Sequence, residues 1–347
     1  MPLPIYQERG RAYHVDNCAP LVRAAAQGQV RLMSLARGQY PGRRLGRFDL
    51  PGVRTVGFWD AHCSQNWGLD WHQNEGVELT FLERGSLAYA VDARRCRLQP
   101  GDLTIARPWQ RHCVGDPTIG AGRLHWLILD VGVRRPHQPW QWPAWLVLTR
   151  CDLKELTDNL RKNERPVWHA TPEIRRCFQR ISKAVETDRL GGYHSQITVL
   201  LNELFVLVLE MFRQQRVKHD ESLVSTQRTV ELFWTDLRQN PGHLASAWTV
   251  EAMARQCGLG VTHFIHYSKQ LNNATPIEYL NQCRLEVAAR HLAAEPARSI
   301  TDVAFACGFN SSQYFAKLFR QQFGCAPRDS RLPSFARSSP AKAVARK

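Results

Sequence analysis

The chain has 347 residues, of which 44% are hydrophobic and 22% are charged. This length and composition support two or three folded domains and exclude a chain that is disordered throughout. Lysine and arginine number 46 against 31 for aspartate and glutamate, which gives a formal net charge of +15 and a pI near 9.7. Such an excess favours a polyanionic partner, but it does not choose between nucleic acid and an anionic membrane surface.

Three further classes of protein are disfavoured. The most apolar stretch, residues 197–212, is 16 residues long and contains Asn202, Glu203 and Glu210, whereas a membrane-spanning helix needs about 20 mostly apolar residues. The first residues, MPLPIYQERGR, lack the basic start and apolar run of a secretory signal. The ten cysteines stand singly and form no CxxC pair, which favours reduced thiols in the cytoplasm over a disulfide framework.

Residues 1–150 have the pattern of an all-β domain. Short alternating or aliphatic runs are separated by turn-forming sequences such as Glu83-Arg84-Gly85 and Pro100-Gly101-Asp102. These runs cover residues 53–62, 77–83, 87–91, 103–106 and 124–131. Regular spacing of this kind predicts a small sandwich or barrel.

Residues 151–224 change to a helical period. Ile174, Cys177, Phe178 and Ile181 recur at i, i+3, i+4 and i+7. The stretch 197–212 is apolar nearly all round, as expected of a helix that is buried on several sides. Two roles are open for this connector: packing of the helix against the barrel, or formation of a homodimer interface.

Residues 225–331 contain an internal repeat with an offset of 50 residues. The sequence TVEAMARQCGL at 249–259 aligns with SITDVAFACGF at 299–309. Each copy begins at a hydroxyl N-cap, and each has an alanine four residues before a glycine: Ala254 and Gly258, Ala304 and Gly308. Alanine lets the next helix pack closely, and glycine supplies the left-handed backbone that ends the first helix. A plain helical bundle with a solvated polar face is the alternative, which the matched spacing disfavours.

A second helix follows in each copy, and Pro276 begins a long helix between the two units. The expected inward side chains are Phe264, Tyr267 and Leu271 in the first unit and Phe315, Leu318 and Phe319 in the second. The outward side chains are short and polar near the helix start, with a basic residue one turn later. This arrangement suits a helix that enters the major groove of DNA, so the sequence predicts a tandem helix-turn-helix domain.

Residues 225–331 resemble the DNA-binding domain of the AraC/XylS family of bacterial transcription regulators. The motifs that carry the resemblance are SITDVAFACGF at 299–309, SSQYFAKLFR at 311–320 and FGCAP at 323–327. The resemblance implies base contacts by Thr262, Ile265, His266, Ser312, Gln313 and Lys317, and phosphate contacts by Lys269, Ser311 and Arg320. The chain departs from the family pattern at Ser268, where a large apolar residue is usual, at Asn273, where glycine is usual, and at Ser330, where an aromatic residue is usual.

The sequence HQNEGVE at 72–78, with PGD at 100–102 and PWQRH at 108–112, resembles the two motifs of cupin barrels. His72, Glu78 and His112 match the metal ligands of metal-binding cupins, and Asn74 stands where a second histidine is usual. Two histidines and one carboxylate can hold a non-haem metal. Regulators of the AraC/XylS type commonly bind an organic effector in such a barrel without metal, so no cofactor is expected.

A carbohydrate is the leading expectation for the effector, because aromatic side chains can stack on a sugar face. The candidate stacking residues are Trp59, Trp67, Trp71, Trp109 and Trp126, any one of which can instead fill the barrel core. The expected effector site comprises His72, Glu78, Trp71, Arg107, Trp109 and His112.

We therefore expect a multidomain, cytoplasmic transcription regulator and not an enzyme, since no Walker-type loop, nucleophile elbow or HExxH occurs. The expected parts are a cupin-like sensing barrel at 1–150, a helical connector at 151–224, an all-α tandem helix-turn-helix domain at 225–331 and a basic tail at 332–347. The expected partners are an operator DNA, a small effector, RNA polymerase and a second copy of the chain, with no membrane. The alternatives are a metal-dependent cupin enzyme or metal sensor using His72, Glu78 and His112, and a constitutive DNA-binding protein without a ligand.

Overall fold

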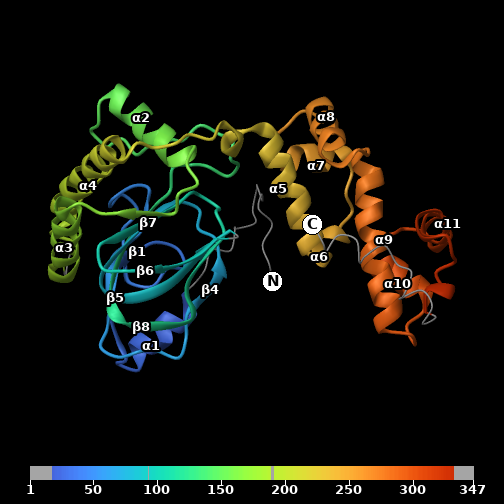
Figure 1. The fold of residues 1–347 in the computed structure, drawn as a ribbon, viewed down its shortest axis with the longest axis horizontal. Helices are drawn as coiled ribbons and strands as arrows, with labels where there is room; N and C mark the ends of the chain where they lie inside the picture. Colours follow the sequence, from blue (N-terminus) through green and yellow to red (C-terminus); the bar gives the residue numbers. More distant parts are fainter. Residues whose placement is uncertain (1–17, 93, 189–190, 332–347) are drawn as a thin grey trace. The chain divides into compact units, whose positions relative to one another are not determined.

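The computed structural model describes residues 18–92, 94–188 and 191–331. The described residues divide into two compact units, one within residues 18–226 and the other within residues 227–331 (Figure 1). The basic tail expected at 332–347 lies outside the described residues. The fold class is confirmed: a β-sheet domain comes first, and a helical region with helix-turn-helix units follows.

The first unit is built on one curled sheet of nine strands (Figure 1). These strands are β1 (Val30–Ala36), β2 (Arg43–Arg44), β3 (Val53–Ala61), β4 (Leu69–His72), β5 (Val77–Val91), β6 (Arg94–Leu98), β7 (Asp102–Ala106), β8 (His112–Leu129) and β9 (Val167–His169). The main order is β2-β1-β3-β8-β5-β7-β9, with β4 paired to β8 and β6 paired to β5. The register between β5 and β8 shifts three times, and such irregularities bend strands.

Helices α2 (Arg150–Arg161), α3 (Pro172–Thr187) and α4 (His194–Gln215) follow the sheet, and α1 (Ala19–Ala26) precedes it. Side chains of α3 and α4, such as Phe178 and Phe205, belong to the same buried cluster as Val56, Leu79 and Leu127 of the sheet. The connector helices therefore pack against the sheet and close its core. This finding supports the first of the two roles considered for the connector.

Helix α4 has 22 residues, because it extends beyond the apolar stretch 197–212 at both ends. By length and composition alone it is sufficient to cross a membrane, and half of its most apolar window is buried inside the protein. That burial, against α3 and the sheet, is what a core helix of this composition shows.

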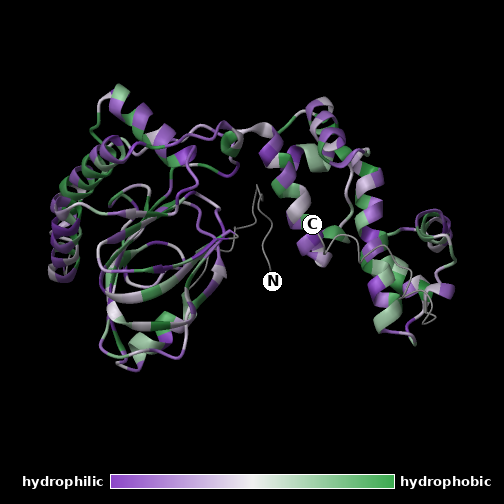
Figure 2. Cartoon of the chain, viewed as in Figure 1, coloured by the Kyte–Doolittle hydropathy of each residue, from purple (hydrophilic) through white to green (hydrophobic). Residues whose placement is uncertain are grey.

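The second unit is helical. Its elements are α5 (Thr226–Gln239), α6 (Pro241–Leu244), α7 (Val250–Gln256), α8 (Val261–Asn272), α9 (Pro276–Ala294), α10 (Ile300–Ala306) and α11 (Ser312–Phe323). Short 3-10 turns cover Glu221–Val224, before α5, and Asp329–Arg331. Figure 2 shows hydrophobic and hydrophilic residues intermixed along these helices, as expected of amphipathic elements.

The two repeats have the local structure that their sequence predicts. The Thr249 hydroxyl accepts a hydrogen bond from the backbone N–H of Ala252, and Ser299 accepts one from that of Asp302. The first helix of each unit ends at a glycine in the left-handed region, with φ +67° at Gly258 and +88° at Gly308. A Cβ at Gly308 would lie 2.5 Å from the carbonyl oxygen of Ala245, so both the turn and the close packing require glycine there.

Candidate DNA-binding surface and effector site

Helix α8 places three of its four predicted DNA contacts in solvent. Thr262, His266 and Lys269 are exposed, and Ile265 is half-buried. On the opposite face Phe264 is fully buried in the core of the second unit. The helix is thus divided into an inner apolar face and an outer polar face, as a groove-reading helix requires.

Helix α11 has the same division. Gln313, Lys317 and Arg320 are exposed, and Ser311 and Ser312 are half-buried. The Ser311 hydroxyl accepts a hydrogen bond from the backbone N–H of Tyr314 at 3.2 Å, so it caps the helix. The buried side is formed by aromatic rings, with Phe315 and Phe319 fully enclosed.

Within the second unit of the chain, helix α9 connects the two helix-turn-helix repeats. It begins with a capping box, in which the Thr275 hydroxyl and the Glu278 carboxylate each accept a hydrogen bond from the other's backbone N–H. Leu280, Ala288 and Leu292 are buried in the core that both helix-turn-helix repeats share. The spacing of α8 and α11 is therefore fixed by one continuous helix of 19 residues.

The three departures from the family pattern each have a structural counterpart. Ser268 is fully buried, and its hydroxyl accepts a hydrogen bond of 3.2 Å from the indole of Trp234. Asn273 ends α8 with φ +51°, a conformation that asparagine adopts more readily than other non-glycine residues. Ser330 is buried and donates to the carbonyl oxygen of Pro327 at 2.7 Å.

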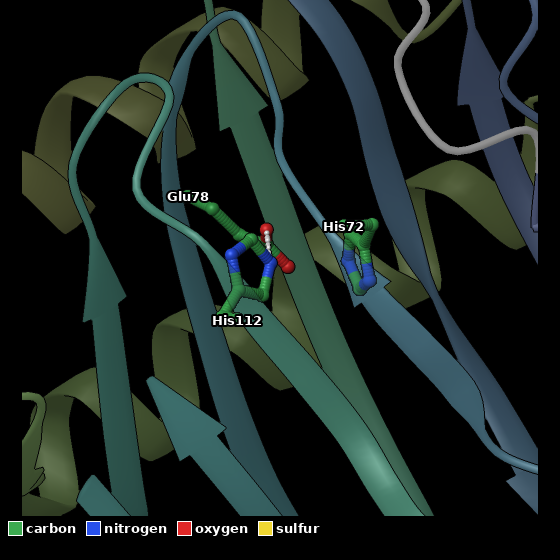
Figure 3. A group of neighbouring side chains, drawn as sticks. All are labelled: His72, Glu78 and His112. Carbon is green, nitrogen blue, oxygen red and sulfur yellow. Dashed lines mark ion pairs between the residues drawn. The ribbon is translucent and has the colours of Figure 1, made fainter. Parts of the chain in front are cut away.

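In the first unit the structure brings His72, Glu78 and His112 together from β4, β5 and β8 (Figure 3). Their ligand atoms all lie within 4.8 Å of one another. Glu78 Oε2 is 2.9 Å from His112 Nε2, and the two imidazole rings meet edge to face at 4.3 Å between centroids. Glu78 and His112 are buried, whereas His72 is partly exposed.

Hydrogen bonding fixes the protonation of this cluster. Nδ1 of His112 lies 2.9 Å from the Gln110 carbonyl oxygen, and Nδ1 of His72 lies 2.6 Å from that of Asp70, so each Nδ1 carries a proton. Since His112 Nε2 also faces a carboxylate oxygen, either a proton, which makes the imidazole positively charged, or a metal ion lies between them. Burial alone would raise the pKa of Glu78, but the His112 charge and hydrogen bond outweigh it and lower the pKa to about 2.

Asn74 occupies the remaining side of the cluster. Its Nδ2 donates to Glu78 Oε2 at 2.5 Å and lies 3.5 Å from His112 Nε2. The Tyr40 hydroxyl is 3.0 Å from Asn74 Oδ1, on the other side of the amide. An amide NH₂ is a donor and cannot ligate a metal, so a metal here would have three protein ligands.

A cavity of about 50 Å³ adjoins this cluster. Most of its lining is apolar or aromatic, and its polar residues are Tyr40, Thr55, His72, Asn74, Glu78 and Thr80. Trp59 and Trp126, two of the candidate stacking residues, also line it. Small-molecule sites usually have about 300–1,000 Å³, so a sugar would enter this cavity only if the strands around it moved apart.

The four other predicted effector residues lie outside this cavity lining: His112, Trp71, Arg107 and Trp109. Trp71 stacks against the guanidinium of Arg111, with 4.9 Å from Cζ to the ring centroid. Arg107 donates to the Asn163 carbonyl oxygen at 2.7 Å, and the Trp109 indole donates to that of Val133 at 2.8 Å. Sequence reasoning missed Tyr40, Thr55 and Thr80, because nothing in the motif around residues 72–78 indicates which distant strands face it.

A family model described as a helix-turn-helix domain matches residues 253–332. HTH-type transcriptional activator RhaS of Escherichia coli strains SE11 and 55989 is 33% identical over 128 residues, which are 37% of this chain and 44% of RhaS. The chain thus spans less than half the length of the curated relatives that it matches. These matches confirm the AraC/XylS resemblance of the C-terminal unit.

Among solved structures, unsaturated fatty acid bound wild-type ToxT from Vibrio cholerae strain SCE256 is similar over 81% of this chain and 95% of its own, with 12% identity and a TM-score of 0.35. The C-terminal domain of AraT, a response regulator from Geobacillus stearothermophilus, is similar over 30% of this chain and 83% of its own. Its identity is 22% and its TM-score is 0.27.

Proposed function

We propose that this chain, whose C-terminal unit is a helix-turn-helix domain of the AraC/XylS type, is a cytoplasmic, sequence-specific DNA-binding regulator of transcription. The observation that carries the proposal is the pair of matched units, each with an exposed polar helix, α8 and α11, on an aromatic core. The helix-turn-helix match at 253–332 and the similarity to a transcriptional activator support it.

In this proposal α8 and α11 enter successive major-groove turns on one side of the DNA, held at a fixed separation by α9. The base-reading side chains are Thr262, Ile265, His266, Ser312, Gln313 and Lys317, and the phosphate-contacting residues are Lys269, Ser311 and Arg320. Lysine and glutamine side chains match base edges in the major groove, and charged contacts to phosphates set the position of the protein along the DNA.

Selection from a random duplex pool tests the proposal. The full chain should enrich one motif, and Gln313→Ala should weaken binding to that motif by about 1–3 kcal/mol. Gln239→Ala is the matched control, because Gln239 is an exposed glutamine at the end of α5. Enrichment of no motif, or equal losses for the two variants, would contradict sequence-specific reading by α11.

We further propose that a small effector binds in the barrel beside His72, Glu78 and His112. The effector would shift the population between arrangements of the DNA-binding units, which requires different affinities for those arrangements. In one arrangement two chains would occupy adjacent half-sites and contact RNA polymerase. Val199 and Val206 of α4 are 64% and 43% exposed, one heptad apart, and would contribute to the homodimer contact.

A sugar panel tests the effector proposal. A binding sugar should raise the thermal midpoint of the full chain by mass action. Trp59→Ala should abolish that rise, because Trp59 lines the cavity, whereas Trp71→Ala should retain it. If neither sugars nor aromatic acids shift the midpoint, a DNA-binding protein without an effector becomes the better proposal.

The second candidate function is a metal sensor. The Nδ1 contacts of His72 and His112 to backbone carbonyls are the arrangement that orients metal-ligating histidines. Metal analysis of the full chain purified without chelator decides it: below about 0.1 metal per chain the metal candidate fails. Where metal is found, His112→Ala should remove it.

A further inference from the structure

We propose that a cleft lined by three arginines in the first unit binds a small organic anion that carries a carboxylate or phosphate group. The cleft has a volume of about 420 Å³, within the range of small-molecule sites. It shares no lining residue with the cavity beside His72.

Chain segments that are far apart in sequence build this cleft. Arg37 follows β1, Arg47 precedes β3, and Arg54 lies within β3. The opposite wall is formed by Asp130 and Gly132, which follow β8, and by Gln141 and Pro143. Backbone hydrogen bonds hold these segments together: Arg37 N–H to Arg54 O at 2.7 Å, and Asp130 N–H to Gly52 O at 2.8 Å.

The charges that line the cleft are unbalanced. Its one lining carboxylate, Asp130, is already bound by Arg54 at 2.6 Å and by Arg134 at 3.1 Å. Arg54 also pairs with Glu75 at 3.0 Å. Among the described residues, no carboxylate lies within salt-bridge distance of Arg37 or Arg47.

Arg37 is held in place by backbone acceptors instead of a counter-charge. Its Nη2 donates to the Asp49 carbonyl oxygen and its Nη1 to that of Arg47. Its Nε is buried and has no hydrogen-bond partner among the described residues. Burial and the nearby Arg54 charge lower the pKa of the Arg37 guanidinium, although the Asp49 charge acts in the opposite direction.

A guanidinium without a salt-bridged carboxylate matches a carboxylate or phosphate, because its remaining N–H groups can donate to the oxygens of the anion. The cleft leaves room beside that group for a polar body, which Gln141 can bind by hydrogen bonds. An anion here would connect the β1 and β3 ends of the sheet to the segment that leads from β8 into α2. A sugar phosphate or a sugar acid has this combination of an anionic group and a polar body, and a neutral sugar does not.

Titration calorimetry on the full chain, without DNA, tests the proposal with glucose 6-phosphate, glucuronate and glucose. At least one of the two anions should saturate a single site per chain, and the stronger of the two identifies the anionic group. Arg47→Gln and Arg37→Gln should each weaken that binding about tenfold or more. Arg176→Gln is the matched control, since this exposed arginine on α3 lies outside the cleft and should leave binding unchanged.

Each of the following outcomes would overturn the proposal: neither anion saturates a site up to about 10 mM, Arg47→Gln binds as the parent does, or Arg176→Gln weakens binding equally. The last would show that the anion follows the general positive charge of the surface. Arg47 is exposed, so its replacement tests the site even if Arg37→Gln does not fold. Glucose competing for the site would also contradict the anionic specificity. None of these outcomes bears on DNA binding.

Discussion

At the scale of single residues, position 268 shows how an unusual amino acid is accommodated. The large apolar residue of the family pattern is replaced by a serine that is fully buried. The indole of Trp234, on α5, donates to its hydroxyl and lies tilted against Phe264, with 5.9 Å between ring centroids. The sequence shows the small residue but not its large partner, because Trp234 lies 34 positions earlier in the chain.

Ser268→Leu should therefore destabilise the second unit. The space that leucine would occupy is already filled by Trp234, so we expect overpacking to cost about 1–3 kcal/mol. Chemical denaturation of the full chain, followed through the transition of the helical unit, measures this cost. A more stable Ser268→Leu variant would mean that Trp234 leaves a hole there.

Lys317 is the residue whose replacement best separates base reading from charge attraction, because it is exposed on α11. Lys317→Ala should weaken binding to the selected motif by about 1–3 kcal/mol if the ammonium group contacts a base. Affinities for the motif and for random DNA, measured at equal salt, decide the question. Equal losses on both would identify Lys317 as a phosphate contact.

At the scale of elements, α10 and the turn after it form a packing unit that tolerates little change. Ala304 is fully buried and lies one helical turn before Gly308. The backbone of Ala245 occupies the space that a Cβ atom at Gly308 would need. Ala304→Leu should destabilise the second unit by about 1–3 kcal/mol through overpacking and reduce DNA binding with it. Ala293→Leu, at an exposed position near the end of α9, supplies the comparison. Unchanged unfolding and DNA binding of Ala304→Leu would contradict the proposed helix crossing.

A hydrogen-bonded chain of Ser182, His125 and Glu83 joins α3 to β8 and β5. His125 Nδ1 is 2.6 Å from the Ser182 hydroxyl, and His125 Nε2 is 2.6 Å from Glu83 Oε2. Ser182 and His125 are 2% and 1% exposed, so no substrate can reach this serine. This hydrogen-bond network therefore has a structural role: it connects the helix to the sheet.

This hydrogen-bond network should make the free energy of unfolding depend on pH. The His125 hydrogen bond lowers the pKa of Glu83 from 4.5 to about 2, so its ionised form stabilises the folded state above pH 4.5, and this contribution is lost as the pH falls toward 2. Burial lowers the pKa of His125 below 6.5, which acts in the same direction. The free energy of unfolding, measured at a series of pH values, should fall less below pH 4.5 for Glu83→Gln than for the parent protein. The same slope in both proteins would contradict this prediction.

At the scale of the whole molecule, features formed by residues close together in the sequence could be predicted, and most features formed by residues far apart in the sequence could not. The helix-turn-helix units were predictable because caps, an alanine and a glycine act within a few residues of one another. The meeting of His72, Glu78 and His112 was predictable from the barrel motifs. The cavity lining was not, because Tyr40 comes from the turn after β1 and Thr55 from β3, and only the three-dimensional fold places them beside residues 72–78. The arginine cleft, assembled from loops after β1 and β8, left no pattern in the sequence.

The most direct test of the central claim is a footprint of the full chain on DNA from its own upstream region, measured across a salt series. We expect saturable binding that protects about 20 bp per chain, in two segments about one helical turn apart on one face of the DNA, with affinity falling as salt rises. Weak protection that is equal on every sequence would contradict it, and would reduce the positive charge to a general attraction for polyanions.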